Sequence, residues 1–474
     1  MNSLPPEIIR TIVSHLIDQT RWVPEINEQC PKTPLSSYAA ISRQWQTIVE
    51  TITFRHLILT SSKLTIADSN HYLTPLRLSY IRYIWFDFEF PAHNLTVSTN
   101  PEDYDDQLVF NKTVKQLLGV LSRIPTRPEP VVGLEIFIST PRKYCIPWGF
   151  VSRRPNEMDG VFHGRVRTTY VELLEEWDVG LPELAAIFYF RVELGSRSII
   201  FSPSSINLIA AKMSRLLKVE WWLCDGEKVD TELRIRQRTM FAETLATIPK
   251  SLKCFRLEYI REPPQRRSYQ PPSIVPPDAQ GDLLSRSLHH FTQRDGLDDF
   301  FLQASVDSTI FWPQTLQAKD YAHWPSIRVL HVELNDVLPS GQWIDVPDSS
   351  RGALPSTPPH IIFDDDIPGE EFDWKFPSTY SQAAMDGFAF AAGKCAAHMP
   401  KIQELNVFHH GHSHAGICFN TVVQTEPCLE FAGDPDVPEP SPETLATWRE
   451  TVKTHGLEWR VNITDDMANV HHFY

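Results

Sequence analysis

The chain has 474 residues, of which 42% are hydrophobic and 22% are charged, and its formal net charge is -15. These fractions are close to the averages of folded soluble proteins, so they exclude a wholly disordered chain and a bundle of membrane helices. The negative charge repels phosphate backbones, which argues against nucleic acid as a partner. The longest basic stretch, Arg234–Arg238, is interpreted as a solvated face of a helix.

The cysteines and the first residues of the chain indicate in which cellular compartment the protein is expected. Seven cysteines lie between Cys30 and Cys428 without a Cys-x-x-Cys pair, which argues against a disulfide framework or a zinc ribbon. A reducing compartment is therefore expected, either the cytoplasm or the nucleus. The first residues lack the features of a signal peptide, and no run approaches the ~20 apolar residues of a membrane span, so no membrane partner is expected.

Two amphipathic helices are expected at the start of the chain. Pro5 and Pro6 suit a first helical turn, where the missing N–H is not needed, and Ile8, Ile12 and Leu16 follow at intervals of four. A second periodic run places on one face Leu35, Tyr38, Ile41, Trp45 and Ile48. A unit this small buries too little apolar area to be stable alone, so we expect a partner surface.

The segment Leu4-Pro5-Pro6-Glu7-Ile8-Ile9, followed by Ala40-Ile41-Ser42-Arg43-Gln44-Trp45, resembles the F-box pattern Leu-Pro-x-Glu-Ile and Val-Ser-Arg-x-Trp. The connection from Asp18 to Pro34 is longer than usual and contains three prolines. The alternative is an ordinary helical cap on a larger domain.

The resemblance to fungal F-box proteins implies an F-box over residues 1–58 that docks onto the Skp adaptor of a cullin-RING (SCF) ubiquitin ligase. It also implies a set of adaptor-binding residues: Leu4, Pro5, Glu7, Ile8, Ile9, Ile12, Leu16, Leu35, Ile41 and Trp45.

The rest of the chain repeats the spacing apolar-x-x-apolar-x-apolar-x-apolar, which predicts a strand with one buried face. It occurs at Ile81-Ile84-Phe86-Phe88, Val131-Leu134-Ile136-Ile138, Leu216-Val219-Trp221-Leu223, Leu252-Phe255-Leu257-Tyr259, Ile327-Leu330-Val332-Leu334 and Ile402-Leu405-Val407-His409. The starts differ by 50, 85, 36, 75 and 75 residues. A true leucine-rich repeat recurs every 20 to 29 residues or so.

Helical periodicity precedes several of these segments, at Val114–Leu121, Phe241–Ile248 and Met385–Met399. Helices that alternate with strands predict a parallel sheet. We therefore expect an α+β protein: a small all-α F-box, then an irregular α/β leucine-rich-repeat-like solenoid over residues 59–474. A compact α/β domain is the alternative. Loop insertions are expected near 262–280, which is rich in proline, and near 345–380, which is acidic and lacks the spacing of a calcium loop.

A histidine-rich segment follows the last predicted strand. Gly411-His412-Ser413-His414-Ala415 approaches the nucleophile elbow Gly-x-Ser-x-Gly, with Asp434 or Asp436 and then His455 downstream. A serine esterase-like hydrolase using Ser413 is thus the runner-up, although Ala415 replaces the second glycine. Zinc would need three or four converging ligands, and we expect no metal and no cofactor.

The favoured interpretation is a substrate-recognition subunit that is not an enzyme, with an F-box adaptor acting outside ubiquitination as a further alternative. Binding residues concentrate on loops held by a rigid scaffold, so a protein target is expected at the rim of strand ends. The candidates for target contacts are His409, His410, His412, His414, Asn335 and Trp343.

Overall fold

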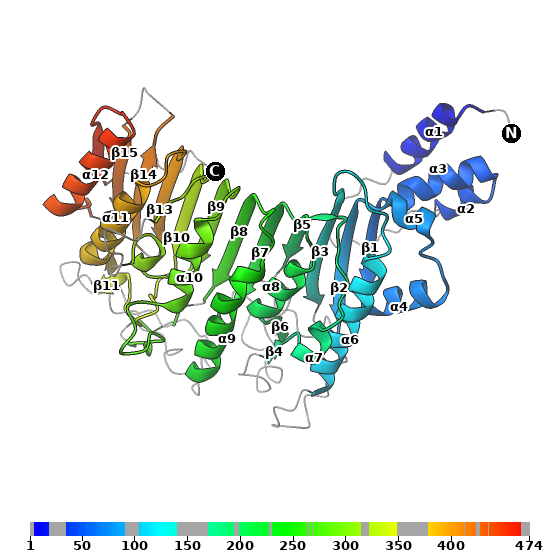
Figure 1. The fold of residues 1–474 in the computed structure, drawn as a ribbon, viewed down its shortest axis with the longest axis horizontal. Coiled ribbons are helices and arrows are strands. Elements are labelled where there is room, and N and C mark those ends of the chain that lie inside the picture. The colour runs from blue at the N-terminus through cyan, green and yellow to red at the C-terminus, as the bar shows by residue number, and fades with distance from the viewer. Residues whose placement is uncertain are drawn as a thin grey trace, which may run out of the picture.

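The computed structural model describes residues 4–18, 35–90, 104–139, 169–193, 199–226, 230–261, 263–264, 266–267, 269–313, 322–347, 378–411, 413–422, 427–434 and 436–465. These residues form a mixed α/β structure built on a large, mostly parallel sheet (Figure 1). The expected combination of helices with parallel strands is confirmed.

The main sheet has 12 strands that lie in chain order from one edge to the other. They are β1 (His56–Thr60), β2 (Tyr83–Glu89), β3 (Val132–Ser139), β5 (Ile187–Val192), β7 (Lys218–Cys224), β8 (Cys254–Ile260), β9 (Asp299–Ala304), β10 (Val329–Leu334), β13 (Glu404–His410), β14 (His414–Asn420), β15 (Leu429–Asp434) and β16 (Val461–Thr464). Among the described strands, β14 alone is antiparallel to both of its neighbours. Two small sheets pair β4 (Thr169–Val171) with β6 (Ile199–Phe201) and β11 (Asp345–Pro347) with β12 (Ser378–Tyr380).

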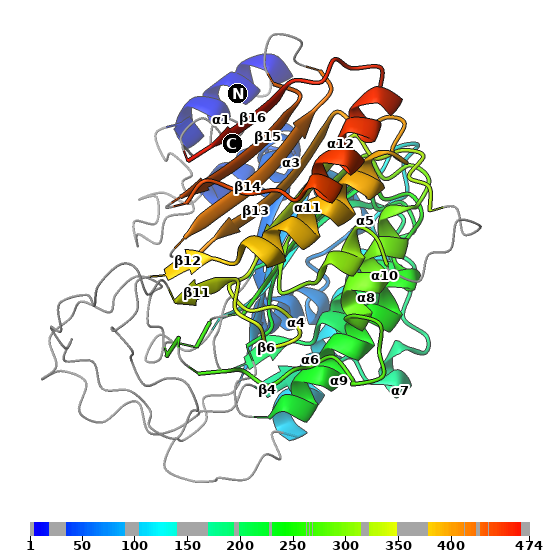
Figure 2. The same ribbon diagram turned by 90° about the vertical axis from the view of Figure 1, so that its left-hand side faces the viewer.

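The described helices that follow the first strand cover one face of the main sheet (Figure 2). They are α4 (Ser61–Ser69), α5 (Pro75–Tyr80), α6 (Tyr104–Leu121), α7 (Glu175–Asp178), α8 (Pro203–Ala211), α9 (Thr231–Thr244), α10 (Leu283–Thr292), α11 (Gln382–Ala396) and α12 (Pro442–Thr454). Aromatic rings join the two layers, for example Phe291 of α10 and Phe255 of β8, whose centroids are 4.8 Å apart. None of the described helices is both long and apolar enough to cross a bilayer.

The strand pattern read from the sequence is confirmed. All six segments form strands of the main sheet, and their apolar positions are buried against the helices, with Val131 only partly so. Alternate residues of a strand point to opposite faces, so the residues between these positions lie on the face without helices. The three predicted helical segments are also helical, in α6, in α9 with the 3-10 turn Leu245–Thr247, and in α11.

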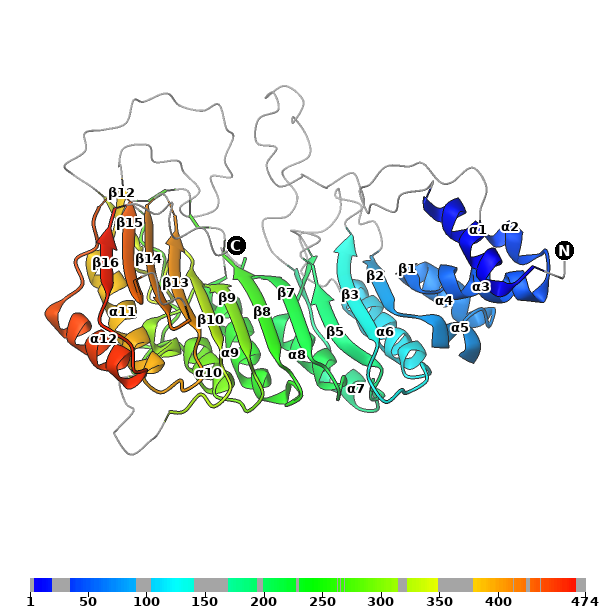
Figure 3. The ribbon, with the colours of Figure 1, turned by 90° about the horizontal axis from the view of Figure 1, so that it is seen from above.

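Three short helices precede the sheet: α1 (Pro6–Asp18), α2 (Ser36–Ala39) and α3 (Arg43–Thr53). They share a small core of Ile9, Val13, Trp45, Ile48 and Val49. The side chain of Ser42 caps α3 by accepting a hydrogen bond from the backbone N–H of Trp45. We call α1, α2 and α3 the three-helix unit, and Figure 3 shows it beside β1, at one end of the sheet.

The three-helix unit is joined closely to the sheet. Arg55 alone separates Phe54, the C-cap of α3, from β1, and its carbonyl accepts hydrogen bonds from the backbone N–H groups of Arg82 and Tyr83. The Arg77 guanidinium of α5 lies 2.7 Å from the Glu50 carboxylate of α3. This hydrogen bond lowers the pKa of Glu50.

The interpretation of Arg234–Arg238 as a solvated helix face is wrong for two of its arginines. Arg234 and Arg238 of α9 are buried, and both guanidiniums bind the Asp225 carboxylate, at 2.6 and 2.9 Å. Arg238 also binds Asp282, the N-cap of α10, at 2.9 Å. Burial by itself raises the pKa of Asp225, but the two guanidiniums outweigh it and leave that pKa below its usual value.

The proline-rich insertion is an irregular loop packed on the segment that follows β10. The backbone N–H of Ile274 donates to the carbonyl of Pro339, and the indole N–H of Trp343 donates to the carbonyl of Tyr269 at 2.8 Å. Gly341 has a positive φ of 80°, and a Cβ there would lie 2.1 Å from the carbonyl oxygen of Pro271. The loop is therefore part of the folded structure. Most of the second insertion, at 348–377, lies outside the described residues.

A buried histidine makes stability depend on pH. His289 of α10 is 0% exposed, its Nε2 has no partner, and burial followed by the charge of His290 lowers its pKa to about 4. The unfolded chain binds this proton below about pH 6.5, whereas the folded chain does not until about pH 4. As the pH is lowered from about 6.5 to about 4, the free energy of unfolding should therefore decrease, by up to about 1.4 kcal/mol per pH unit.

Denaturant titrations between pH 7 and pH 4 measure this slope. His289→Gln should flatten it, whereas the same change at the exposed His290 should leave most of it. An equal slope in wild type and His289→Gln would assign the acid sensitivity to other groups.

Candidate functional site

The three-helix unit exposes large apolar side chains. The apolar set consists of Leu4, Ile8, Ile12 and Ile41, which are 36%, 47%, 37% and 43% exposed. Ile8 and Ile12 lie one turn apart on α1, beside the buried Ile9 and Val13. The helix thus carries one apolar stripe for the core of the unit and a second that faces solvent. Neighbouring exposed apolar side chains are typical of an interaction surface.

The other residues expected to bind the adaptor have different positions. Pro5 and Glu7 are exposed, and Leu16 and Leu35 are half-buried. Ile9 and Trp45 lie in the core of the unit. Their role is therefore to hold α1 against α3 and so to position the apolar set.

On the helix-free face of the sheet, the strand register aligns side chains into rows, of which some members are half-buried and others, such as Asp87, Glu135 and Phe408, are buried. One row alternates charge over four strands, from Glu135 of β3 through Arg191 and Glu220 to Arg256 of β8. It continues with Phe301 and His331, whose rings stack at 4.8 Å. We call it the charge ladder.

The neighbouring row, toward the carboxyl ends of the parallel strands, alternates acids with aromatic rings. In strand order it contains Asp87, Phe137, Glu193, Trp222, Glu258, Gln303, Glu333 and Phe408. Glu193 belongs to it because Val192 pairs with both Ile136 and Trp221, one residue earlier on each strand. This acid–aromatic row has four carboxylates and no cation of its own.

Contacts join the two rows. The Arg191 guanidinium lies 4.6 Å from the ring centre of Trp222 and 2.5 Å from the Glu193 carboxylate. Arg256 lies 3.9 Å from the ring centre of Phe301 and 3.3 Å from Glu258. The sheet face thus already places arginine between an aromatic ring and a carboxylate, a geometry that combines cation–π attraction with an ion pair.

Two carboxylates of the acid–aromatic row have raised pKa values, mainly because they are partly buried. Burial raises the pKa of Glu193 although Arg191 lowers it, and the carboxylate of Glu135 adds to the rise. Burial likewise raises the pKa of Glu258, and the carboxylate of Glu333 adds to that rise.

No protein-family model matches this chain, and no curated protein matches it.

The sequence did contain a signal for the acid–aromatic row. In each of the six strand segments, the row takes the residue between the third and fourth apolar positions, which places there Asp87, Phe137, Trp222, Glu258, Glu333 and Phe408. Gln303 lies in β9 and Glu193 directly follows β5, two strands that the pattern did not identify. Alignment of the six segments on their apolar residues reveals most of the row.

The residues expected at a target-binding rim do not form one surface. His410 is exposed and lies 5.8 Å from the half-buried ring of His414, while Asn335 is half-buried. His409 and Trp343 are buried and hydrogen-bonded internally, so they cannot contact a target as the sequence predicted. His412 lies outside the described residues.

Ser413 belongs to a buried polar cluster around Asp345. The Asp345 carboxylate accepts hydrogen bonds from Nε2 of His409 at 2.9 Å, from the hydroxyl of Ser413, and from Arg267 at 2.8 Å. Burial raises the pKa of Asp345, but His409, Ser413 and Arg267 outweigh it and leave the pKa below its usual value. The cluster ties β13, β11 and the proline-rich loop together.

This geometry differs from a serine hydrolase, in which the imidazole lies between the serine and the carboxylate. Here the carboxylate lies between Ser413 and His409. The other expected members of the triad are engaged separately, because Nε2 of His455 lies 3.0 Å from the carbonyl of Ala396 and the Asp436 carboxylate binds Thr379. The described residues do not bring these groups to Ser413.

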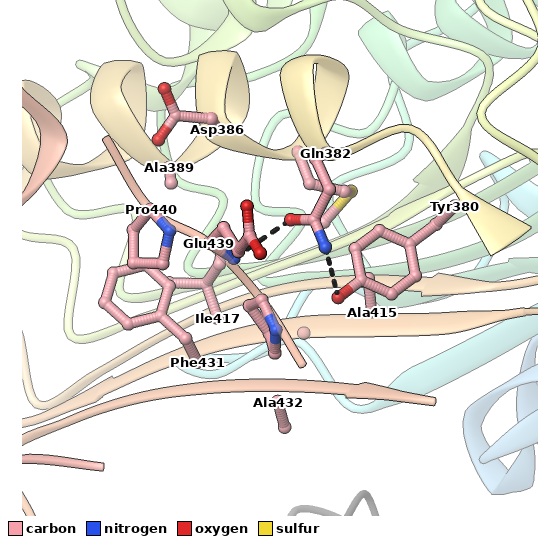
Figure 4. Close-up of a pocket in the computed structure, with 13 residues that line it drawn as sticks. Tyr380, Gln382, Asp386, Ala389, Ala415, Ile417, Phe431, Ala432, Glu439 and Pro440 are labelled. Carbon is pink, nitrogen blue, oxygen red and sulfur yellow. Dashed lines mark hydrogen bonds between the residues drawn. The ribbon is translucent and has the colours of Figure 1, made fainter. Parts of the chain in front are cut away.

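Among the described residues, one group has donors suited to a metal ion: Asp336, Asp345 and His409, whose ligand atoms lie within 4.8 Å of one another. The Arg267 guanidinium already supplies positive charge there, at 2.8 Å from Asp345 and 3.9 Å from Asp336. A small hollow lies nearby between α11 and strands β14 and β15 (Figure 4). Its interior of about 20 Å³ is large enough for one water molecule but too small for a substrate.

Proposed function

We propose that the protein is a substrate-recognition subunit of an SCF ubiquitin ligase, in which the three-helix unit docks onto the Skp adaptor and the sheet binds a protein target. The observation that carries this proposal is the exposure of Leu4, Ile8, Ile12 and Ile41 on a unit whose own core has five residues. The F-box-like segments Leu4–Ile9 and Ala40–Trp45 contribute most of this apolar set.

The sheet is suited to the second role. We interpret residues 59–474 as an irregular leucine-rich-repeat-like solenoid, because successive strands are neighbours and helices cover one face. The helix-free face then holds charged and aromatic side chains on a rigid scaffold. A hydrolase role is not favoured, since the Ser413 hydroxyl is held by a carboxylate.

Adaptor binding can be tested with substitutions in the exposed stripe of α1. The double change Ile8→Glu, Ile12→Glu should lower the affinity for a purified Skp adaptor by at least about 100-fold, because two buried apolar anchors are replaced by charges. The matched control is Ile66→Glu in α4, which is 56% exposed but lies on another helix. It should bind the adaptor as wild type does.

Pull-down and titration calorimetry measure this affinity, and thermal melting verifies that each variant is folded. Wild-type affinity in a folded Ile8→Glu, Ile12→Glu variant would rule out this docking surface. Ubiquitination of a captured target, present with wild type and absent with the double variant, separates a ligase subunit from an adaptor-binding protein that acts outside ubiquitination.

A further inference from the structure

Three arginines lie together near the amino ends of β1, β2 and β3, beside the three-helix unit. Arg55 links α3 to β1, and its carbonyl accepts hydrogen bonds from the backbone N–H groups of Arg82 and Tyr83. The guanidinium of Arg82 donates to the carbonyl of Ser79 at 3.1 Å, and the guanidinium of Arg127 donates to the same oxygen at 2.6 Å. One neutral acceptor thus holds two positive groups next to each other. We call Arg55, Arg82 and Arg127 the arginine patch.

Further hydrogen bonds hold this arrangement in place. Arg82 also donates to the carbonyl of Ile81, the C-cap residue of α5, at 2.7 Å. Arg215 donates to the carbonyl of Arg127 at 2.7 Å. Carbonyl groups at the carboxyl end of a helix attract cations, which explains why both guanidiniums lie at the end of α5. These bonds orient the two side chains but leave their positive charges uncompensated.

Within the described part of the chain, no carboxylate forms an ion pair with the arginine patch. Burial lowers the pKa of Arg82, and the like charges of Arg127 and Arg55 lower it further. Arg77 of α5 shows the contrast, because its hydrogen bond to the Glu50 carboxylate raises its pKa. The patch is therefore a local concentration of positive charge on a chain whose net charge is -15.

The arginine patch can be reached by a partner. Arg55 is exposed, and Arg82 and Arg127 are half-buried. The bonds to carbonyl groups use one terminal nitrogen of each of the latter two guanidiniums. The other N–H groups of a guanidinium form a planar fork that binds a carboxylate through two hydrogen bonds. Aspartate and glutamate side chains are thus the groups that suit the patch.

We propose that Arg55, Arg82 and Arg127 form a docking site for an acidic segment of the protein that binds the three-helix unit. The inference rests on the proposed function for the identity of that protein, the Skp adaptor. Arg55 directly follows α3, and Arg77 ties α5 to α3, so a partner on the three-helix unit has the patch beside it. Nucleic acid is the less suitable occupant, because three arginines on an acidic chain neutralise few phosphates.

Two labelled eight-residue peptides test the charge preference on the full-length protein. One alternates glutamate with glycine, and the other has glutamine in place of each glutamate. Fluorescence anisotropy at low salt should show the glutamate peptide binding at least about tenfold more tightly, and added salt should weaken it. The net charge of -15 alone predicts the reverse order. Equal affinities, or tighter binding of a labelled single-stranded oligonucleotide with the same charge, would overturn the proposal.

Substitutions then locate the site. Arg55→Gln should weaken binding of the glutamate peptide about threefold, and the triple change Arg55→Gln, Arg82→Gln, Arg127→Gln at least about tenfold. Thermal melting verifies that each variant is folded. Because Arg55 is exposed, its single variant is expected to fold even if the triple variant does not. Wild-type affinity in the folded variants would show that the patch is not the site.

Arg328→Gln is the matched control. Arg328 is exposed like Arg55, and its carbonyl likewise accepts hydrogen bonds from the backbone N–H groups that begin the next strand, those of Gln403 and Glu404. It precedes β10, in the other half of the sheet. This variant should bind the glutamate peptide as wild type does, and a loss equal to that of Arg55→Gln would contradict the proposal.

Adaptor capture distinguishes this inference from the proposed function. The triple variant should bind the Skp adaptor more weakly and with a shallower salt dependence, whereas Ile8→Glu, Ile12→Glu should keep its preference for the glutamate peptide. Unchanged adaptor affinity in the folded triple variant, or adaptor binding without a glutamate preference, overturns the inference alone. A glutamate preference without adaptor binding overturns the receptor role alone.

Discussion

Replacing Arg238 by methionine should lower the free energy of unfolding by about 3 to 5 kcal/mol, whereas the same change at Arg236 should alter it by no more than about 0.5 kcal/mol. The two arginines lie two residues apart on α9, but Arg236 is exposed and Arg238 is buried. The pair therefore compares one substitution in two environments on one helix.

The large cost arises from the partners that Arg238 leaves behind. Its guanidinium binds Asp225 and Asp282 and donates to the carbonyl of Ser305, all at 2.9 Å. Without it, the buried Asp282 carboxylate keeps only its neighbours Ser285 N–H and hydroxyl, and Asp225 keeps Arg234. An uncompensated buried charge costs far more than the ion pair itself contributes.

Urea titration at pH 7 measures the difference. The pKa of Asp225 is lower in the folded chain than in the unfolded chain, so its stabilisation is present above the unfolded pKa and is lost only as pH falls through the folded value. The measurement at neutral pH thus reports the intact network. A loss below about 1 kcal/mol for Arg238→Met would show that the network does not stabilise the fold.

Leu257→Ala should lower the free energy of unfolding by about 2 to 5 kcal/mol. Leu257 is 0% exposed at the centre of β8, with β7 and β9 on either side and the helical layer above. Truncation removes apolar contacts and leaves a cavity. The strand cannot move to close it, because β8 is hydrogen-bonded to a neighbour on each side.

Leu76→Ala in α5 is the matched control, because Leu76 is 58% exposed. It should change stability by no more than about 0.5 kcal/mol. Similar losses in the two variants would contradict the burial of Leu257. An unfolding transition that becomes broader in Leu257→Ala would indicate that the sheet unfolds in parts.

The sequence predicts a strand well where four apolar residues face the helices, and it fails where one of them is small or displaced. In β9 the pattern Leu297, Phe300, Leu302 ends in Ala304, which is buried but small. In β5 the pairing with β3 is irregular between Val132 and Gly133, and the buried residues Ile187, Phe190 and Val192 lose the regular spacing. These two strands lie within the gaps of 85 and 75 residues that made the repeat look so irregular.

The sites were harder to predict because their members come together only through register and long loops. The partners of Arg238 lie 13 and 44 positions away, so a window of helical periodicity cannot show that they meet. His409 occupies the fourth position of the strand pattern, after three buried apolar residues. A residue that was expected at a rim therefore lies inside the core. The exposed residues Ile8 and Ile12 of α1 could be predicted because a single helix carries two adjacent apolar stripes.

The close connection between α3 and β1 fixes the position of the three-helix unit at one edge of the sheet. With Arg55 as the whole linker, and with Glu50 paired to Arg77, the three-helix unit cannot swing freely about β1. The acid–aromatic row runs from β2 to β13, the second to the ninth strand of the order, which is a span of about 34 Å at the usual strand spacing. Each strand along the row thus lies about 4.8 Å farther from the three-helix unit than the strand before it, so the distance of any position on the sheet from that unit is set by the strand that carries it.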